Sequence, residues 1–271
     1  MVGMSLGHIA RQYREIVSRT NPFVTLAASL RDKKGRDASG LFAAEGVKLL
    51  GDMLAAGVAP RHLIVTHSAA RKFPILAEVP PCDTVVVTDE VYAKITGESS
   101  PQGVMCLIAK ADCPNVRVIP RMRGPAAALW GVQDPGNAGT IIRAAAALGM
   151  AETVLCGSCA DPFSPKVVRA TMGAVFRHDI ALPPGGWDPV EEYKAAGFEI
   201  YAACPGEGSV DIRDVKFGER SLVILGSEGG GLPEEITSRC VRVGIPMAAG
   251  AESLNVASAA AVLFWQVTSD K

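Results

Sequence analysis

From residue 126 onward, short apolar runs of strand length alternate with longer segments of helical spacing. Strands that alternate with helices in this way predict a parallel sheet covered by helices on both faces. In such sheets, ligands bind beyond the carboxyl ends of the strands. The predicted strands are 126–132, 153–156, 199–203, 221–225 and 241–245, and the predicted helices are 139–148, 166–171, 187–196, 233–239 and 253–268.

The earlier part of the chain predicts a second, smaller α/β unit. We expect an amphipathic helix over 1–20. A second helix over 22–31 is expected because Asn21-Pro22 places a capping residue before a proline at the first helical position. Asp89 is expected to cap a further short helix. The other predicted elements are strands 41–44, 62–66, 84–88 and 103–109 and helix 45–56.

Length and composition suit two folded domains. The 271 residues are 48% apolar, enough for two cores, and the 20% of charged residues argues against a disordered chain. Residues 111–125 contain three prolines, so we place a linker over 113–125, between domains 1–112 and 126–271. The chain has no run of 18 apolar residues, and its start lacks a signal-peptide pattern, so we expect a soluble cytoplasmic protein.

The cysteines and the net charge argue against several classes of protein. Seven cysteines without a secretory signal are expected to be free thiols. Cys156 and Cys159 form a lone CxxC, which favours small apolar residues at a strand end over the alternative of a redox or zinc site, because no second CxxC or paired histidine lies nearby. The net charge of −1 argues against a nonspecific nucleic-acid binder. Two basic groups on a neutral chain nevertheless favour a local phosphate-binding surface. They are Arg31, Lys33, Lys34 and Arg36, and Arg117, Arg121 and Arg123.

The first polar segment after a predicted strand is 137–143 (NAGTIIR). Asn137 could serve as the N-cap of the following helix and nothing more. Arg143, however, lies in an otherwise apolar helix, and a charge among apolar neighbours must be paired or lie near a ligand. The presence of Arg143 therefore favours a functional site in segment 137–143 over a simple turn.

The second segment is 225–232 (LGSEGGGL). It lacks the Gly-Lys-Ser/Thr of a P-loop and the spacing of the dinucleotide fingerprint. Three consecutive glycines after a buried strand allow positive φ and close backbone approach, which suits a loop around an adenosine or a ribose. The alternative is a flexible turn before the helix at Pro233.

The third segment is 245–258 (IPMAAGAESLNVAS), which leads into the last helix. Ser253 is a natural N-cap for that helix. Asn255 is expected inside the first turn, where a cap would not need it. The small residues 257–261 allow this helix to pack close to another backbone.

In this order, the three segments resemble the signature motifs of the SpoU (TrmH-type) branch of the SPOUT RNA methyltransferases: NxGxxxR, LGxEGxGL and IPM…SLNV. Residues 163–175 (FSPKVVRATMGAV) are also typical of the family. Asn21-Pro22, 42–47 (FAAEGV) and 101–103 (PQG) make the first domain similar to the family's L30e-like substrate-binding domain. Ala138 and Thr140 depart from the residues that are frequent there, but neither removes a reacting group.

The resemblance implies a deep trefoil knot in the second domain, bound S-adenosylmethionine, and a homodimer whose active site is completed across the interface. The implied reaction is 2′-O-methylation of a ribose in RNA. Large-subunit ribosomal RNA is the expected substrate because the first domain resembles ribosomal-protein-like binders, and transfer RNA stays open. A noncatalytic RNA-binding protein of the same fold is the second alternative. A nucleotide-dependent oxidoreductase is disfavoured because the fingerprint is missing.

The candidate site residues follow from the motifs and the resemblance. Because a guanidinium stays protonated, we expect Arg143 to stabilise the developing alkoxide and to grip the adjacent phosphate, not to act as a simple base. Glu228 could hold Arg143 or take a proton through water. The catalytic candidates are Arg143, Asn137, Glu228, Ser253 and Asn255; the cofactor-binding candidates are Leu225, Gly226, Gly230, Ile245, Pro246 and Leu254; the RNA-binding candidates are Arg31, Lys33, Lys34, Arg36, Lys166 and Arg169.

Overall fold

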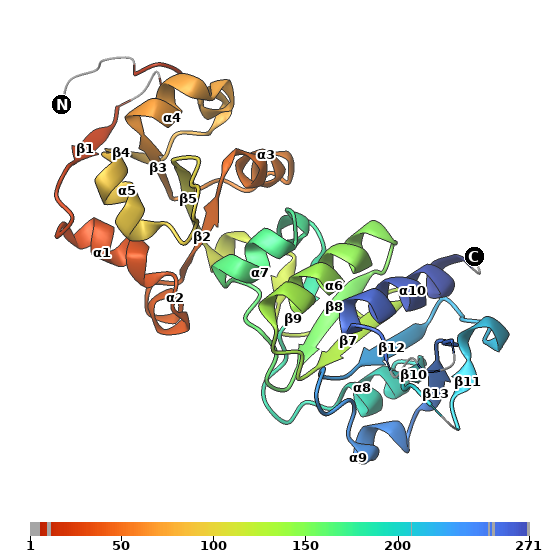
Figure 1. Cartoon of the computed structure of the whole chain (residues 1–271). Helices are drawn as coiled ribbons and strands as arrows, with labels where there is room; N and C mark the ends of the chain where they lie inside the picture. The colour runs from red at the N-terminus through yellow and green to blue at the C-terminus, as the bar shows by residue number, and fades with distance from the viewer. Residues whose placement is uncertain (1–5, 10–11, 207, 249, 251–252, 270–271) are drawn as a thin grey trace. The chain divides into compact units, whose positions relative to one another are not determined.

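The computed structural model describes residues 6–9, 12–206, 208–248, 250 and 253–269 (Figure 1). The chain forms two compact units. One comprises Met1–Pro114 with Asp161–Phe176, and the other comprises Asn115–Ala160 with Arg177–Lys271. The segment Asp161–Phe176, predicted within the second domain, therefore packs with the first unit.

The first unit contains a mixed five-stranded sheet in the order β1-β4-β3-β5-β2. Strands β1, β4 and β3 run parallel, and β5 pairs antiparallel with β3 and β2. Alternating apolar residues of these strands pack against α1 and α5 in one core. The strands are β1 (Arg14–Ile16), β2 (Leu41–Glu45), β3 (His62–Thr66), β4 (Asp83–Val87) and β5 (Val104–Ala109).

The helices of the first unit are α1 (Pro22–Ser29), α2 (Lys33–Ser39), α3 (Val47–Ala55), α4 (His67–Lys72), α5 (Asp89–Ile95) and α7 (Pro165–Ala170). The start of α1 is confirmed, because the Asn21 side chain accepts a hydrogen bond from Phe23 N and Pro22 is the first helical residue. Two local predictions are wrong. Residues Arg14–Ile16 form a strand that pairs with β4, and the cap of α5 is Thr88 instead of Asp89.

The predicted helix over 1–20 thus fails where the chain is described, and positions 1–5 and 10–11 lie outside the described residues. The basic stretch after Asp32, left unassigned from sequence, forms α2. Helix α4 was also not predicted.

Segment Asp161–Phe176 is attached to the first unit by aromatic contacts and a buried ion pair. The ring centroids of Phe163 and Phe42 lie 4.8 Å apart. Arg36 is only 3% exposed, and its Nη2 donates to Asp161 Oδ2 at 2.8 Å. Its Nη1 donates to the carbonyl groups of Leu30 and Arg31 at 2.8 Å each. The Arg36 guanidinium therefore makes its hydrogen bonds inside the protein.

The second unit is built on an eight-stranded sheet in the order β11-β13-β10-β12-β7-β8-β9-β6. All its pairings are parallel, which confirms the predicted fold class for this part of the chain. Its strands are β6 (Val116–Arg117), β7 (Ala126–Trp130), β8 (Glu152–Cys156), β9 (Asp179–Ala181), β10 (Glu199–Ala203), β11 (Val210–Asp211), β12 (Ser221–Leu225) and β13 (Val241–Gly244).

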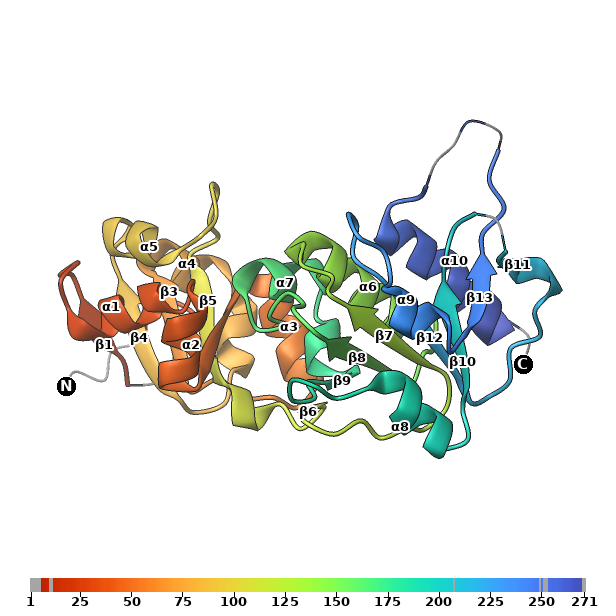
Figure 2. The ribbon, with the colours of Figure 1, turned by 90° about the horizontal axis from the view of Figure 1, so that it is seen from below.

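Helices α6 (Pro135–Ala147) and α10 (Val256–Ser269) cover one face of this sheet, and α8 (Pro189–Ala195) and α9 (Glu234–Thr237) cover the other (Figures 1 and 2). Because every strand is parallel, the loops that follow β13, β10, β12, β7, β8 and β9 emerge at one edge. All three sequence motifs begin or end at that edge. None of the helices described is long and apolar enough to cross a membrane.

The predicted linker is fixed onto the second sheet. Strand β6 pairs with β9, and the buried Glu152 carboxylate accepts hydrogen bonds from the backbone N–H groups of Arg121 and Met122 at 2.7 Å each. The Tyr193 hydroxyl donates to the same carboxylate at 2.7 Å. Three donors offset the cost of burying this charge.

We predict that Arg36→Ala lowers the free energy of unfolding by about 3 kcal/mol, because it leaves the Asp161 carboxylate without its buried partner. Lys34→Ala, on the exposed side of the same helix, should change it by less than about 0.5 kcal/mol. Urea denaturation followed by circular dichroism measures both. Equal midpoints for the two variants would show that the ion pair does not stabilise the first unit.

Candidate active site

The first turn of α6 leaves the Asn137 side chain free for other contacts. Asp134 is the N-cap, and its Oδ1 accepts a hydrogen bond from Asn137 N at 2.7 Å. Pro135 follows as the first helical residue. The possibility that Asn137 serves only as a cap is therefore wrong, since the cap precedes it by three residues.

Asn137 joins the three sequence motifs. Its Nδ2 donates to Glu228 Oε1 at 2.6 Å, and its Oδ1 accepts from Asn255 Nδ2 at 3.1 Å. Glu228 lies 91 residues away along the chain and Asn255 lies 118 residues away. The parallel sheet therefore brings a helix start, a glycine loop and the last helix to one point.

Asn255 is the residue that caps α10. Its Oδ1 accepts from Ala257 N at 2.9 Å and from Ser258 N at 3.3 Å. Because α10 begins at Val256, Ser253 lies too early to cap it, so the expected cap at Ser253 and the expected place of Asn255 inside the first turn are both wrong. Because the side-chain oxygen Oδ1 of Asn255 faces the start of α10, its side-chain nitrogen Nδ2 faces Asn137.

The glycine segment after β12 is a closed turn. Ser227 N donates to Gly231 O at 3.2 Å, and Gly231 N donates to Ser227 O at 3.0 Å. Gly231 has φ of +61°, and a Cβ on Gly226 would lie 2.3 Å from the Gly231 carbonyl carbon. Glycine is thus required at both ends of the turn, and the turn holds Glu228 towards Asn137.

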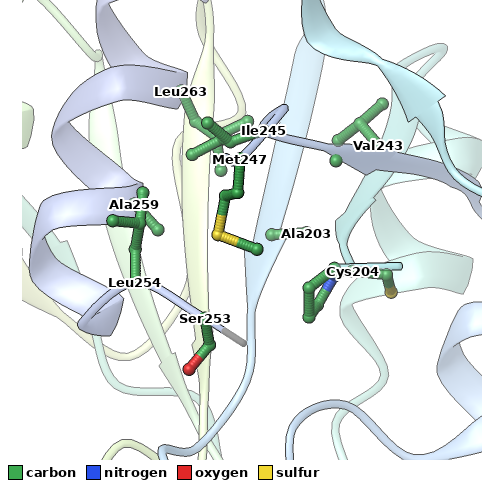
Figure 3. A pocket seen from close by; sticks show the side chains of 11 residues that line it. Ala203, Cys204, Val243, Ile245, Met247, Ser253, Leu254, Ala259 and Leu263 are labelled. Carbon is green, nitrogen blue, oxygen red and sulfur yellow. The ribbon is translucent and has the colours of Figure 1, made fainter. Parts of the chain in front are cut away.

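A small apolar pocket lies at the carboxyl ends of β10 and β13 and is lined by Leu254, the residue before Asn255 (Figure 3). Its largely apolar lining is typical of a small-molecule site. Figure 3 shows the Met247 side chain between Leu254 and Ala203. The lining residues are Ala203, Cys204, Pro205, Val243, Gly244, Ile245, Met247, Ser253, Leu254, Ala259 and Leu263.

Two of the predicted cofactor-binding residues, Ile245 and Leu254, line this pocket, and so does Ser253 from the catalytic list. Leu225, Gly226, Gly230 and Pro246 are outside its described lining. Leu225 is buried at the end of β12, and Gly230 lies in the glycine turn, where its N–H donates to Ser227 Oγ at 3.3 Å. Positions 249, 251 and 252 of the third motif lie outside the described residues.

Residues 203–205 and Met247 line the pocket without having been predicted. The strand Glu199–Ala203 was expected from sequence, and the rule that ligands bind at carboxyl ends of parallel strands would have pointed to its last residues. What the sequence lacked was the strand order, which places β10 between β13 and β12.

Arg143 is not joined to these groups. It is exposed on α6, and it makes no hydrogen bond or ion pair with any residue that the structure describes. The expected contact between Glu228 and Arg143 is absent from the described chain, and Glu228 accepts a hydrogen bond from Asn137 instead. A guanidinium presented to solvent in this way is available to a ligand or to a second chain.

Some of the candidate RNA contacts are paired with a carboxylate of the protein, and others are exposed. Lys33 donates to Asp37 at 2.6 Å, and this hydrogen bond raises the lysine pKa. Hydrogen bonds from Lys110 and Lys33 lower the pKa of Asp37 to about 2. Arg169 forms an ion pair with Glu98. The exposed candidates are Arg31, whose Nε donates to Ala28 O, together with Lys34 and Lys166.

Arg36 is a correction to the list of RNA contacts. Its buried guanidinium already donates to Asp161, Leu30 and Arg31, so it offers nothing to a phosphate. Sequence spacing could not separate it from its neighbours, since all four cations stand within six residues.

The CxxC is held by packing. Cys159 Sγ donates to the carbonyl groups of Leu129 and Cys156, and burial raises the pKa of both thiols. Thiols in this state are poor nucleophiles. Within the described chain, no group of three His, Cys, Asp or Glu side chains is placed to hold a metal ion.

We predict that Asn255→Asp and Asn255→Ala separate the two roles of this residue. Asp keeps an oxygen that can cap α10, so the free energy of unfolding should stay within about 0.5 kcal/mol, while Ala should lower it by about 1 kcal/mol. Thermal and urea denaturation measure both values. If Asp destabilises the protein as much as Ala does, the capping assignment is wrong.

Comparison with known proteins adds two family matches. Residues 126–265 match the SpoU rRNA Methylase family, and residues 21–106 match the MRM3-like substrate binding domain. An uncharacterized tRNA/rRNA methyltransferase of Synechocystis is 33% identical, over 93% of this chain and 92% of its own. The 23S rRNA (guanosine(2553)-2′-O)-methyltransferase of Bacillus subtilis is 27% identical, over 94% of this chain and 99% of its own.

Solved structures give the same result. An AdoMet-bound rRNA methyltransferase from Sinorhizobium meliloti superposes with a TM-score of 0.82 and 33% identity, over 95% of this chain and 98% of its own. A TrmH-family protein from Porphyromonas gingivalis gives a TM-score of 0.80 and 30% identity, over 93% of this chain and 99% of its own. The chain belongs to the SpoU rRNA Methylase family, a family of RNA methyltransferases.

Proposed function

We propose that this protein transfers a methyl group from S-adenosylmethionine to the 2′ oxygen of a ribose in large-subunit ribosomal RNA. The observation that supports it most directly is the hydrogen-bonded chain from Glu228 through Asn137 to Asn255, beside an apolar pocket. The name of the Bacillus subtilis relative, a 23S rRNA 2′-O-methyltransferase, supports the choice of oxygen and of RNA.

The lining of the pocket fits an adenosine. Side chains such as Val243, Ile245 and Leu254 offer an apolar surface without a charge, so an uncharged purine is accepted and a phosphate is not. When bound, S-adenosylmethionine supplies a methyl group on a positively charged sulfur. We propose that Leu225, Gly226, Gly230 and Pro246 contribute main-chain contacts from the loops that flank the pocket. Ser253, which lines the pocket, would then contact the cofactor or the substrate.

The remaining residues prepare the ribose oxygen. The 2′-hydroxyl group must lose its proton as the oxygen forms its new bond to carbon. Glu228 Oε1 accepts from Asn137, so the second carboxylate oxygen is free to take that proton directly or through a water molecule. Asn137 is fixed by bonds on both sides of its amide and positions the carboxylate. Arg143 stabilises the negative charge that develops on the oxygen and grips the adjacent phosphate.

A second copy of the chain would complete this arrangement. Arg143 has no partner among the described residues of its own chain, which supports an active site assembled across an interface. Two large apolar side chains of α10 are exposed, Trp265 by 62% and Val262 by 40%, and a homodimer would cover them. The proposal also includes the deep trefoil knot and the cytoplasmic location that the resemblance implies.

RNA binding is assigned to the exposed cations of the first unit and of α7. Arg31, Lys34 and Lys166 are the candidates with the most accessible charge. Lys33 and Arg169 would have to exchange a carboxylate partner for a phosphate, so their contribution should be smaller.

The function is tested by transfer of radiolabelled methyl from S-adenosylmethionine to ribosomal RNA and transfer RNA isolated from a strain that lacks this gene. We expect label in large-subunit ribosomal RNA, at a position resistant to alkaline cleavage. Label only in transfer RNA would contradict the substrate. Absence of label together with tight RNA binding would identify a noncatalytic RNA-binding protein.

We predict that Arg143→Ala lowers the turnover number about 1000-fold, in the range found when an oxyanion donor is removed. Arg143→Lys should lower it at least about tenfold, because an ammonium keeps the charge and loses the two-pronged geometry. Calorimetric affinity for S-adenosylhomocysteine serves as the control and should stay unchanged. A lysine variant with full turnover would contradict the role of the guanidinium shape.

The cation assignment predicts a change in salt dependence. Lys34→Ala should flatten the log–log plot of RNA affinity against salt by about one unit, because one phosphate contact is lost. The matched variant Lys33→Ala should change the slope less, since Asp37 already pairs with that lysine. Filter binding at salt concentrations from about 50 to about 200 mM measures both slopes. An unchanged slope for Lys34→Ala would remove α2 from the RNA surface.

A further inference from the structure

A wide groove runs along the carboxyl ends of β7, β8 and β9. It consists of two adjoining cavities of about 560 and 870 Å³, which share Trp130 and Ser158 in their lining. The first cavity reaches the glycine turn and includes Glu228. The second extends to Trp187 and Arg239. The groove is therefore continuous with the candidate active site.

The strand order places this groove opposite the cofactor pocket. In the sheet, β13 and β10 lie on one side of β12, and β7, β8 and β9 lie on the other. The pocket of Figure 3 is at the ends of β10 and β13, whereas the groove is at the ends of β7, β8 and β9. The turn that holds Glu228 follows β12, between the two. A molecule in the groove thus approaches Glu228 from the side away from the pocket.

The lining of the groove suits unpaired bases better than phosphates. Arg239 is the one cation among its described lining residues, and it is paired with Asp188 at 2.8 Å and with Glu191 at 2.9 Å. Glu235 adds a negative charge at the groove, and its carboxylate has no ion-pair partner among the residues that the structure describes. No free positive charge among these residues is therefore left for a backbone phosphate.

Two of the three tryptophans of the chain lie in this groove. Both are partly exposed, and both also pack against the core of the second unit. Trp187 is held edge-on by Tyr193, with ring centroids 6.2 Å apart. Indole rings that are fixed on one side and open on the other stack well on bases, and stacking tolerates every base because each has a π face. Two prolines and two glycines at 183–186 complete the wall.

We propose that this groove binds the unpaired RNA nucleotides that flank the methylated ribose, with one base stacked on Trp130 and a neighbouring base stacked on Trp187. Trp130 lies nearer the reaction, because it lines the cavity that contains Glu228 as well as the one that contains Trp187. The inference rests on the proposed function for the identity of its ligand. It makes both tryptophans positioning residues for the substrate strand and selects single-stranded over paired RNA.

The test compares Trp130→Leu with Trp130→Phe, and Trp187→Leu with Trp187→Phe, and the Trp265→Phe change is added only for the fluorescence measurement. Leucine keeps apolar bulk and lacks a π face, while phenylalanine keeps one. The probe is a 12-nucleotide single-stranded oligouridine, and the control is a 12-base-pair RNA duplex. Each leucine variant should bind the oligouridine about 10- to 100-fold more weakly, each phenylalanine variant should retain most of the affinity, and duplex binding should not change.

Two further measurements make the result specific. Oligouridine should quench the fluorescence of the remaining tryptophans, and the quenching should fall when either groove tryptophan is replaced. With ribosomal RNA as substrate, the leucine variants should raise KM far more than they lower kcat, and S-adenosylhomocysteine affinity should not move. Leucine and phenylalanine variants with equal affinity for oligouridine would overturn the proposal. Loss of the calorimetric signal for S-adenosylhomocysteine would also overturn it, since the effect would then be structural.

The proposed function and the groove can fail separately. If the wild-type protein methylates no RNA and still binds oligouridine through the two tryptophans, the methyl transfer is wrong and the groove stands. If it methylates ribosomal RNA and the leucine variants do so with unchanged KM, the groove is wrong and the reaction stands.

Discussion

The side-chain amide of Asn137 is the interaction on which the arrangement of the site depends. It donates to Glu228 and accepts from Asn255, so one residue sets the positions of a glycine turn and of the last helix. The direction of these bonds is not arbitrary, because Asn255 must turn its oxygen to the first N–H groups of α10. A capping bond at a helix start therefore fixes which atom Asn255 presents to Asn137, and that in turn fixes which atom Asn137 presents to the carboxylate.

The parallel sheet decides which loops of the second unit lie next to one another. Because the strands all run in one direction, their following loops meet at one edge, and the strand order decides which loops are adjacent. An apolar pocket lies on one side of β12 and a tryptophan-lined groove on the other, with Glu228 between them. A ligand of the pocket and the proposed RNA strand would thus lie on different sides of β12. Arg143 is exposed and is not among the described lining residues of either cavity.

The basic residues of the first unit differ in whether their charge is already paired within the protein. Arg36, Lys33 and Lys34 are adjacent in the sequence, yet the first is buried against Asp161, the second is paired with Asp37 and the third is exposed. Only a cation whose charge is not already used can bind a phosphate at little cost. The segment Asp161–Phe176 supplies the partner of Arg36 from far along the chain, so the basic stretch could not be interpreted without knowing where that segment packs.

The sequence by itself determined the class of fold, the places of most strands and the three polar segments, because apolar runs and the residues that break them are local properties. It also pointed to the family, since the three segments resemble, in order, the signature motifs of that family. It could not decide that Asp134 and Asn255 are the caps instead of Asn137 and Ser253, because all four have side chains able to cap a helix. Nor could it decide that β10 lies between β13 and β12, or that Trp130 and Trp187 share one groove. Those outcomes depend on which segments become neighbours in space, and only the packing of the whole sheet selects them.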